Sequence, residues 1–136
     1  MSDRIFLDTN VLVYAYTAGD MIKHETAEKL LLGSEDYYVI STQVISEFYV
    51  TLAKYKIEHD KIVGAVSEIT TLCEIQPVKL TTVNYTFEIK KNYGFSYWDS
   101  LILSAALENS CSLLYSEDMQ NGQAVESMMK IVNPFN

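Results

Sequence analysis

Acidic residues at the ends of apolar segments are the side chains of this sequence most able to do chemistry. Asp8 comes directly after residues 5–7 (Ile-Phe-Leu), and Glu117 and Asp118 come directly after residues 112–116 (Ser-Leu-Leu-Tyr-Ser). In open α/β sheets, ligands bind outside the carboxyl ends of the strands, so acids at two strand ends point to a functional site. The local alternatives are a helix cap at Asp8 and a solvated turn at Glu117 and Asp118.

Glu47 lies inside a segment with helical periodicity, residues 42–56, at the flank of an apolar face centred near Phe48 and Leu52. No lysine or arginine lies three or four residues away to pair with it along that helix. Its position therefore favours a site residue, and an ordinary surface glutamate is the alternative.

Asp99 lies in the predicted helix 96–110, where it shares a face with the apolar residues Ile102 and Ala106. Burying an unpaired carboxylate costs several kcal/mol, so such a group is paired, protonated or bound to a metal. The structural alternative is a capping box, in which Asp99 would reach back to Ser96. We favour a functional role, because Asp is shorter than the Glu or Gln usual at that capping position.

The elements that position these acids alternate between short apolar strands and amphipathic or apolar helices. Strands are predicted at 4–7, 37–41, 73–78, 112–116 and 129–133, and helices at 10–18, 21–33, 42–56, 59–72, 81–94 and 96–110. The strands are continuous apolar runs, which is typical of parallel strands buried on both faces. The pattern predicts an α/β fold, a three-layer sandwich with a central, mostly parallel sheet covered by helices on both faces.

Length and composition indicate one globular domain over residues 1–136. Hydrophobic residues make up 49% of the chain, and no apolar run approaches the roughly 18 residues of a membrane helix. We therefore expect a soluble, cytoplasmic protein without membrane contacts, with Cys73 and Cys111 as reduced core thiols. The net charge of −8 repels phosphate backbones unless cations reverse the sign locally.

Four segments of this sequence together resemble the PIN domain, a family that includes metal-dependent ribonucleases and the VapC-type toxins of bacterial toxin–antitoxin pairs. They are "FLDTNVLVYA", "STQVISEFY", "YWDSLILSAAL" and "LLYSEDMQNG", in the order and at the spacing of the family's acidic blocks. The resemblance implies a PIN-like fold and places the family's acids on Asp8, Glu47, Asp99 and Asp118. It also implies an endoribonuclease that hydrolyses RNA phosphodiester bonds as the toxin of such a pair.

Four carboxylates at one sheet edge need cations, and Mg²⁺ or Mn²⁺ are the hard ions that suit oxygen ligands. We expect Asp8, Asp99 and Asp118 to be metal ligands, and Glu47 to be a ligand or to position the attacking water. The expected supporting residues are Thr9, Asn10, Ser116 and Glu117. Thr9 and Ser116 would orient carboxylates by hydrogen bonds, and Glu117 could share the role of Asp118.

The expected partners are an RNA substrate, a cognate antitoxin protein and a second copy of the chain in a homodimer. Lys54, Lys56, Lys90 and Lys91 are candidate RNA-backbone contacts, with solvated surface lysines as the alternative. Segments 21–32 and 42–56 are candidates for an antitoxin groove.

The sequence also bears on three other functions. A receiver-type phosphoacceptor domain needs adjacent acids after its first strand and a lysine after its last, whereas Asp8 stands alone and Lys130 precedes the core of the last strand. A dehalogenase-type phosphatase needs a second aspartate where this chain has Asn10. The remaining alternative is a catalytically inactive PIN-like module that binds RNA or protein, which the loss of an acid would favour.

Overall fold

A central sheet organises the chain in the computed structural model, which describes residues 3–136. Its strands are β1 (Arg4–Leu7), β2 (Tyr37–Ser41), β3 (Glu74–Gln76), β4 (Leu113–Tyr115), β5 (Ala124–Val125) and β6 (Met129–Val132). The order across the sheet is β3-β2-β1-β4-β6-β5. All neighbouring strands are parallel except β5, which runs antiparallel to β6.

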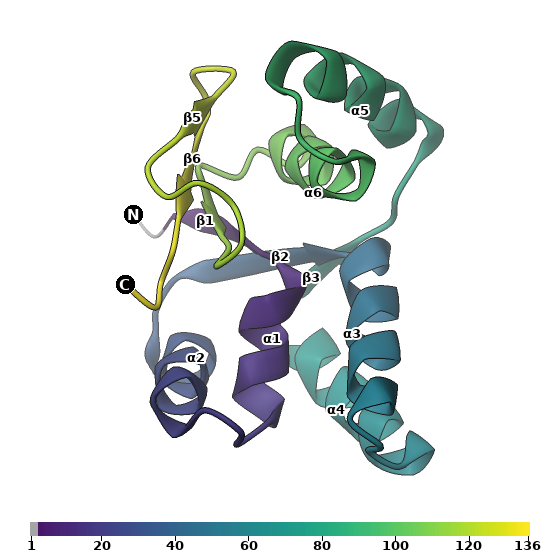
Figure 1. Cartoon of the computed structure of the whole chain (residues 1–136), viewed down its shortest axis with the longest axis vertical. Coiled ribbons are helices and arrows are strands. Elements are labelled where there is room, and N and C mark those ends of the chain that lie inside the picture. Colours follow the sequence, from purple (N-terminus) through teal and green to yellow (C-terminus); the bar gives the residue numbers. More distant parts are fainter. Residues whose placement is uncertain (1–2) are drawn as a thin grey trace.

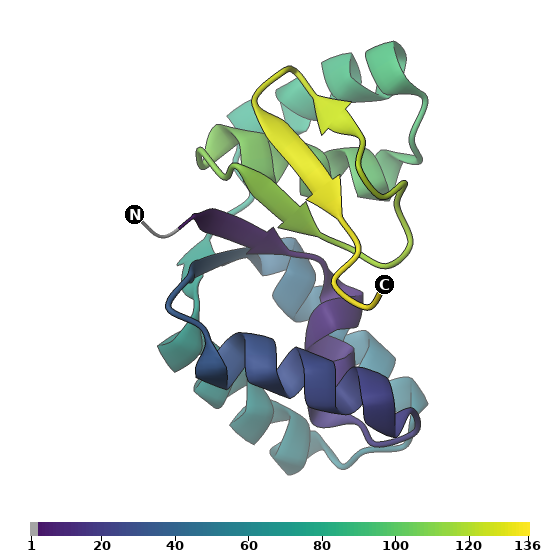
Figure 2. The ribbon, with the colours of Figure 1, turned by 90° about the vertical axis from the view of Figure 1, so that its left-hand side faces the viewer.

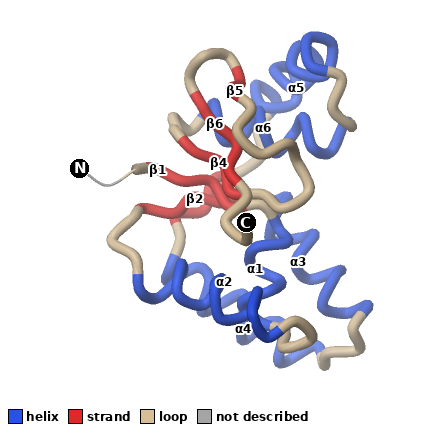
Figure 3. The backbone as a smooth tube through the Cα atoms, turned by 60° about the vertical axis from the view of Figure 1, so that its left-hand side comes forward, coloured by secondary structure: helices blue, strands red, loops and turns tan. Residues whose placement is uncertain are grey.

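Helices cover both faces of this sheet (Figure 1). The helices are α1 (Thr9–Tyr16), α2 (Met21–Gly33), α3 (Thr42–Lys54), α4 (His59–Leu72), α5 (Leu80–Tyr93) and α6 (Tyr97–Glu108). The first four lie on one face, and α5 and α6 lie on the other, as the turned view in Figure 2 also shows. The predicted three-layer α/β sandwich is thus confirmed, with the strands as the central layer in Figure 3. Within residues 3–136, every helix is too short or too polar to span a bilayer.

Burial on both faces explains why the strands are continuous apolar runs. Ile5, Phe6 and Leu7 of β1 are all 0% exposed, because helical layers cover both sides of the central strand. Residues 100–107 of α6 are all buried for the same reason, since α6 packs between α5 and the sheet. Cys73 and Cys111 are buried and unpaired, as predicted.

The strand order places three carboxyl ends next to one another at a single edge. β2, β1 and β4 are adjacent and parallel, so the residues that follow them meet there. The backbone N–H of Asp8 donates to the Tyr115 carbonyl (2.9 Å), which joins the ends of β1 and β4. Because the helices after β1 and β2 lie on the opposite face from α6, this edge is a topological switch point, where α/β sheets open a crevice.

The structure differs from the sequence prediction mainly at short or irregular segments. The prediction missed β5, which has two residues and so carries no periodic pattern. Tyr55 belongs to the apolar face of the predicted helix 42–56, but α3 ends at Lys54, so Tyr55 lies beyond the helix and is 63% exposed. The predicted stop at Gly94 is confirmed, because this residue caps α5 with a φ of 75°, where glycine is favoured.

Candidate active site

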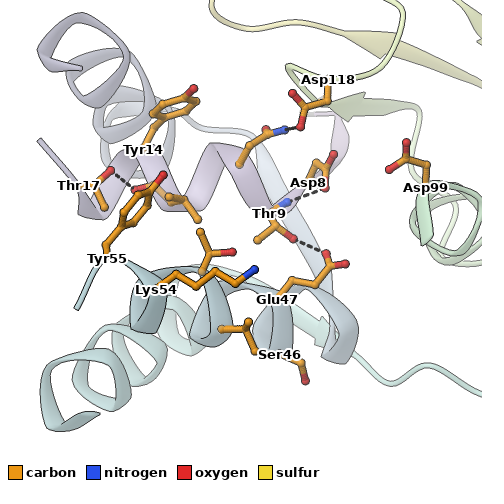
Figure 4. Close-up of a pocket in the computed structure, with 14 residues that line it drawn as sticks. Asp8, Thr9, Tyr14, Thr17, Ser46, Glu47, Lys54, Tyr55, Asp99 and Asp118 are labelled. Carbon is orange, nitrogen blue, oxygen red and sulfur yellow. Dashed lines mark hydrogen bonds between the residues drawn. The ribbon is translucent and has the colours of Figure 1, made fainter. Parts of the chain in front are cut away.

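A pocket of about 610 Å³ opens at the edge formed by the carboxyl ends of β1, β2 and β4. Asp8, Glu47, Asp99 and Asp118 all line it, each from a different part of the chain (Figure 4). We call this the acidic pocket.

Asp8 is the most enclosed of these acids, with 8% of the residue exposed. It is the N-cap of α1, and its carboxylate accepts hydrogen bonds from the Thr9 backbone N–H (2.7 Å) and the Ser116 hydroxyl (2.7 Å). Burial is the main cause that raises the pKa of Asp8 to about 6; the hydrogen bonds from Ser116 and Thr9 oppose the rise, and the charges of Asp99 and Glu47 add to it. Asp8 therefore both caps α1 and lines the acidic pocket, although the sequence suggests these two roles as alternatives.

Glu47 projects into the pocket from the second turn of α3 and is half-buried. Its two carboxylate oxygens accept hydrogen bonds from the Thr9 hydroxyl (2.7 Å) and the Gln43 side-chain amide (3.2 Å). Thr9 thus contacts both acids, Asp8 through its backbone and Glu47 through its hydroxyl (Figure 4). The hydrogen bonds predicted for Thr9 and Ser116 are both present.

Asp99 lies in the first turn of α6, across the pocket from α1 (Figure 4). Ser96 caps this helix by accepting from the Asp99 backbone N–H (3.1 Å). Between residues 3 and 136 no return bond from the Ser96 backbone to the Asp99 carboxylate is present, so only half of the alternative capping box forms. Burial raises the pKa of Asp99, the Ser96 side chain lowers it, and the charges of Asp118 and Glu47 raise it further.

Asp118 and Glu117 follow β4 but face different surroundings. Asp118 is exposed and accepts a hydrogen bond from the Asn10 side-chain amide (3.0 Å). Glu117 does not line the acidic pocket; it forms an ion pair with Lys23 and accepts a hydrogen bond from the Tyr14 hydroxyl (2.7 Å). Burial raises the pKa of Glu117, but these two partners outweigh it and lower the pKa below the ordinary value.

The four candidate RNA-binding lysines lie in different places. Lys54 lines the acidic pocket with its ammonium directed inward (Figure 4). Lys56 lines a separate hollow between the end of α3 and α4. Lys90 and Lys91 lie in the last turn of α5 and do not line the acidic pocket.

The donor set of the pocket fits a hard divalent cation. Carboxylate oxygens are the ligands that Mg²⁺ and Mn²⁺ prefer, and among residues 3–136 the only cationic side chain that lines the pocket is Lys54. In the part of the chain that the structure describes, however, no three acids lie close enough to hold one ion together. Coordination by three carboxylates would therefore require side-chain movement, which the exposed Asp118 and half-buried Asp99 permit.

Sequence analysis missed several residues that the structure adds to this site. Gln43 supports Glu47 from four residues away on the same helix, a spacing that the sequence alone could have indicated. Tyr14 of α1 and Lys23 of α2 both contact Glu117. These residues are about a hundred positions from Glu117 in the sequence, so no local pattern predicts the contacts.

Comparison with known proteins gives one family and a set of similar folds. The PIN domain family model matches residues 5–121. Among solved structures, the sarcin-ricin loop cleaving toxin VapC20 of Mycobacterium tuberculosis is 22% identical, with 84% of this chain and 89% of that chain covered and a TM-score of 0.70. A toxin–antitoxin complex from Klebsiella pneumoniae contains a chain that is 18% identical, with 96% of this chain and 97% of that chain covered and a TM-score of 0.70.

A chain of VapBC2 from Rickettsia felis, bound to a fragment of its promoter DNA, is 20% identical. This match covers 85% of this chain and 88% of that chain, with a TM-score of 0.65. No curated protein matches the sequence significantly. At these identities, the structural likeness shows the fold.

Proposed function

Since this chain belongs to the PIN domain family, we propose that it is a divalent-metal-dependent endoribonuclease and the toxin of a toxin–antitoxin pair. The observation that carries the proposal is the convergence of Asp8, Glu47, Asp99 and Asp118 on one pocket at the switch point of the sheet. All four acids are present, so nothing in the sequence favours the inactive module.

In this proposal the acids are held in place before substrate arrives. Ser116 and the Thr9 N–H fix both oxygens of Asp8, and Thr9 and Gln43 fix Glu47. Such hydrogen bonds lower the cost of bringing carboxylates to a defined geometry. Glu47 is the proposed residue that orients the attacking water, or a further metal ligand.

Asp8, Asp99 and Asp118 are the proposed ligands of Mg²⁺ or Mn²⁺. When bound, the cation supplies positive charge at the phosphodiester and acidifies water for hydrolysis. Burial is the main cause that raises the pKa values of Asp8 and Asp99, and the charges of neighbouring carboxylates add to it. A bound cation would favour the ionised form of both groups. Lys54, on the wall of the pocket, is the proposed contact for a neighbouring phosphate.

The activity is tested by incubating the protein with RNA in Mn²⁺ or Mg²⁺ and in EDTA, and mapping the ends produced. We expect cleavage only with metal, loss of most cleavage in Asp118→Asn, and little loss in Glu117→Gln, whose carboxylate faces Lys23. Full cleavage after exhaustive EDTA treatment would contradict the mechanism. The reverse ranking of the two variants would show that Glu117 and not Asp118 serves the site.

The proposed antitoxin contact is a hollow between α1, α2 and α4, whose lining combines apolar side chains with two acids: Ala15, Tyr16, Leu31, Leu32, Leu72, Glu28 and Glu68. Leu32 is 64% exposed there, which leaves apolar surface for a partner. Helix α1 lies between α2 and α3 (Figure 1), and it contacts both of them. Co-purification with a protein encoded beside the toxin, and its loss in Leu32→Asp, tests this contact.

The proposed homodimer would use α5, where Leu80 and Phe87 are 75% and 57% exposed and lie on one helix face, seven residues apart. We expect the protein to sediment as a dimer, and we expect Phe87→Ala to weaken the association of the two copies. A monomer at high micromolar concentration would argue against it.

A further inference from the structure

A second hollow adjoins the acidic pocket and has a different character. It has a volume of about 490 Å³ and is walled by Trp98, Val78 and Leu101. It shares Ser46 and Glu47 with the acidic pocket, so the two are continuous across the second turn of α3. We call it the Trp98 pocket.

A hydrogen-bonded bridge links the two pockets. The Gln43 side-chain amide donates both to the Trp98 carbonyl (3.2 Å) and to the Glu47 carboxylate (3.2 Å). Both of these partners only accept, so the orientation of the amide is fixed with its nitrogen toward them. The amide oxygen is left buried without a donor, which is unusual for a folded protein.

The indole of Trp98 packs against a neighbouring aromatic ring but remains exposed to solvent. Trp98 packs at right angles to Tyr97, with ring centroids 5.1 Å apart, and Tyr97 in turn contacts Phe87. The residue is nevertheless 60% exposed, beside Asp99 in the first turn of α6. An exposed, braced aromatic ring at the rim of a site is a platform for a flat, apolar group.

We propose that the Trp98 pocket binds one unpaired base of the RNA strand, next to the phosphodiester in the acidic pocket, with Trp98 stacked on the base. This inference rests on the proposed ribonuclease function and names how its substrate is held. Sequence-selective proteins recognise RNA mainly through single-stranded bases splayed out and stacked on aromatic side chains. Val78 and Leu101 provide the apolar contacts that a base face needs, and Gln43 lines the same pocket.

Charge favours this occupant over a purely electrostatic mode of RNA binding. The protein carries a net charge of −8. Within the described part of the chain, Lys54 is the only lysine or arginine that lines either pocket. At these two pockets, affinity for RNA beyond that of the proposed cation and Lys54 therefore has to come from contacts other than phosphate pairing. Base stacking supplies such contacts and is insensitive to the sign of the protein's charge.

The experiment uses Trp98 as its own reporter, because it is the only tryptophan in the chain. Short single-stranded RNAs are titrated into the protein in Mg²⁺ while tryptophan fluorescence and the anisotropy of a labelled RNA are recorded, and cleavage is followed on the same samples. We expect fluorescence quenching that saturates with binding. Trp98→Ala should weaken binding roughly 5- to 100-fold, and Trp98→Phe should weaken it less, because a ring remains.

An RNA lacking the base at single positions identifies the stacked nucleotide. At one position, the abasic RNA should weaken binding to the wild type but produce no further loss in Trp98→Ala, because the same contact is already missing. Tyr37→Ala is the matched control, since Tyr37 is an aromatic residue 51% exposed at the opposite, amino end of β2. Its RNA affinity should equal that of the wild type.

The outcomes separate this inference from the proposed function. RNA binding and cleavage with unchanged tryptophan fluorescence and full affinity in Trp98→Ala would overturn the base pocket and leave the ribonuclease intact. A protein that neither binds nor cleaves RNA would overturn both. If Trp98→Ala instead dissociates a dimer or releases a protein partner while RNA affinity stays unchanged, the pocket is a protein contact and the inference is wrong.

Discussion

Replacing Asp8 with asparagine should make the metal-free protein more stable at neutral pH. The folded protein holds this carboxyl at a pKa of about 6, against an ordinary value of 3.8, mainly because Asp8 is buried. Each pKa unit is worth about 1.4 kcal/mol, so ionising Asp8 costs the fold about 3 kcal/mol above pH 6. The asparagine side chain removes this cost while still accepting from the Thr9 N–H and capping α1, since asparagine is as good an N-cap as aspartate.

The pH dependence has a definite sign. Below a pH of about 4 the carboxyl is protonated in both states, so it contributes no difference in stability. Between about pH 4 and pH 6 the unfolded chain loses its proton while the folded protein retains it, so the contribution of Asp8 to stability falls as the pH rises. Above about pH 6 the full cost is present. The stability gain of Asp8→Asn should therefore be near zero at the acid end and should grow to a maximum of about 3 kcal/mol at neutral pH.

Urea unfolding in EDTA, followed by circular dichroism across this pH range, measures the difference between the two proteins. Asp118→Asn is the matched control, because Asp118 lines the same pocket but is exposed. Its stability should stay within about 0.5 kcal/mol of the wild type at every pH. A stability for Asp8→Asn at or below that of the wild type at neutral pH would refute the reasoning.

Three further predictions concern other parts of the molecule. Asp99→Asn should abolish metal-dependent cleavage yet leave the metal-free fold as stable as before or more stable, because it removes a carboxylate whose charge is disfavoured by burial and by Asp118 and Glu47. Thermal melts in EDTA beside cleavage assays measure both effects, and a destabilised but active variant would mean that Asp99 only supports the cap of α6 at Ser96. RNA binding should weaken only slightly with salt, with a slope of log K against log salt of about −1, because Lys54 is the one lysine or arginine in residues 3–136 that lines the acidic pocket. A slope steeper than about −3 in a salt titration would show phosphate contacts elsewhere. Ser127→Gly should stabilise the fold by about 1 kcal/mol in urea titrations, because the turn between β5 and β6 holds this serine at a φ of 53°, and an unchanged midpoint would mean that the turn is not strained.

The sequence predicted the fold class and the neighbourhood of the acids because both depend on simple patterns. Buried parallel strands are apolar runs, and the acids that follow β1 and β4 had to meet once those strands paired. Helix periodicity placed Glu47 on the flank of α3 and Asp99 on α6, and both line the acidic pocket.

Other features depend on tertiary contacts that no local pattern encodes. Glu117 and Asp118 are adjacent acids after one strand, and only the positions of Lys23 and Tyr14 show that Glu117 turns away. Similarly, Lys54 and Lys56 are two residues apart, but α3 ends between them, so only Lys54 lines the acidic pocket.

The central position of β1 has a consequence for the order in which the molecule forms. β1 pairs with β4, and the hydrogen bond between Ser116 and Asp8 spans 108 residues of sequence. Contacts between residues so far apart in sequence form late and slow down folding, because the chain between them must first lose conformational entropy. During synthesis from the N-terminus, Asp8 and Glu47 leave the ribosome long before β4 exists to complete the edge beside them. We expect a nascent chain that ends before β4 to have no acidic pocket, so that the pocket forms only after β4 has been synthesised.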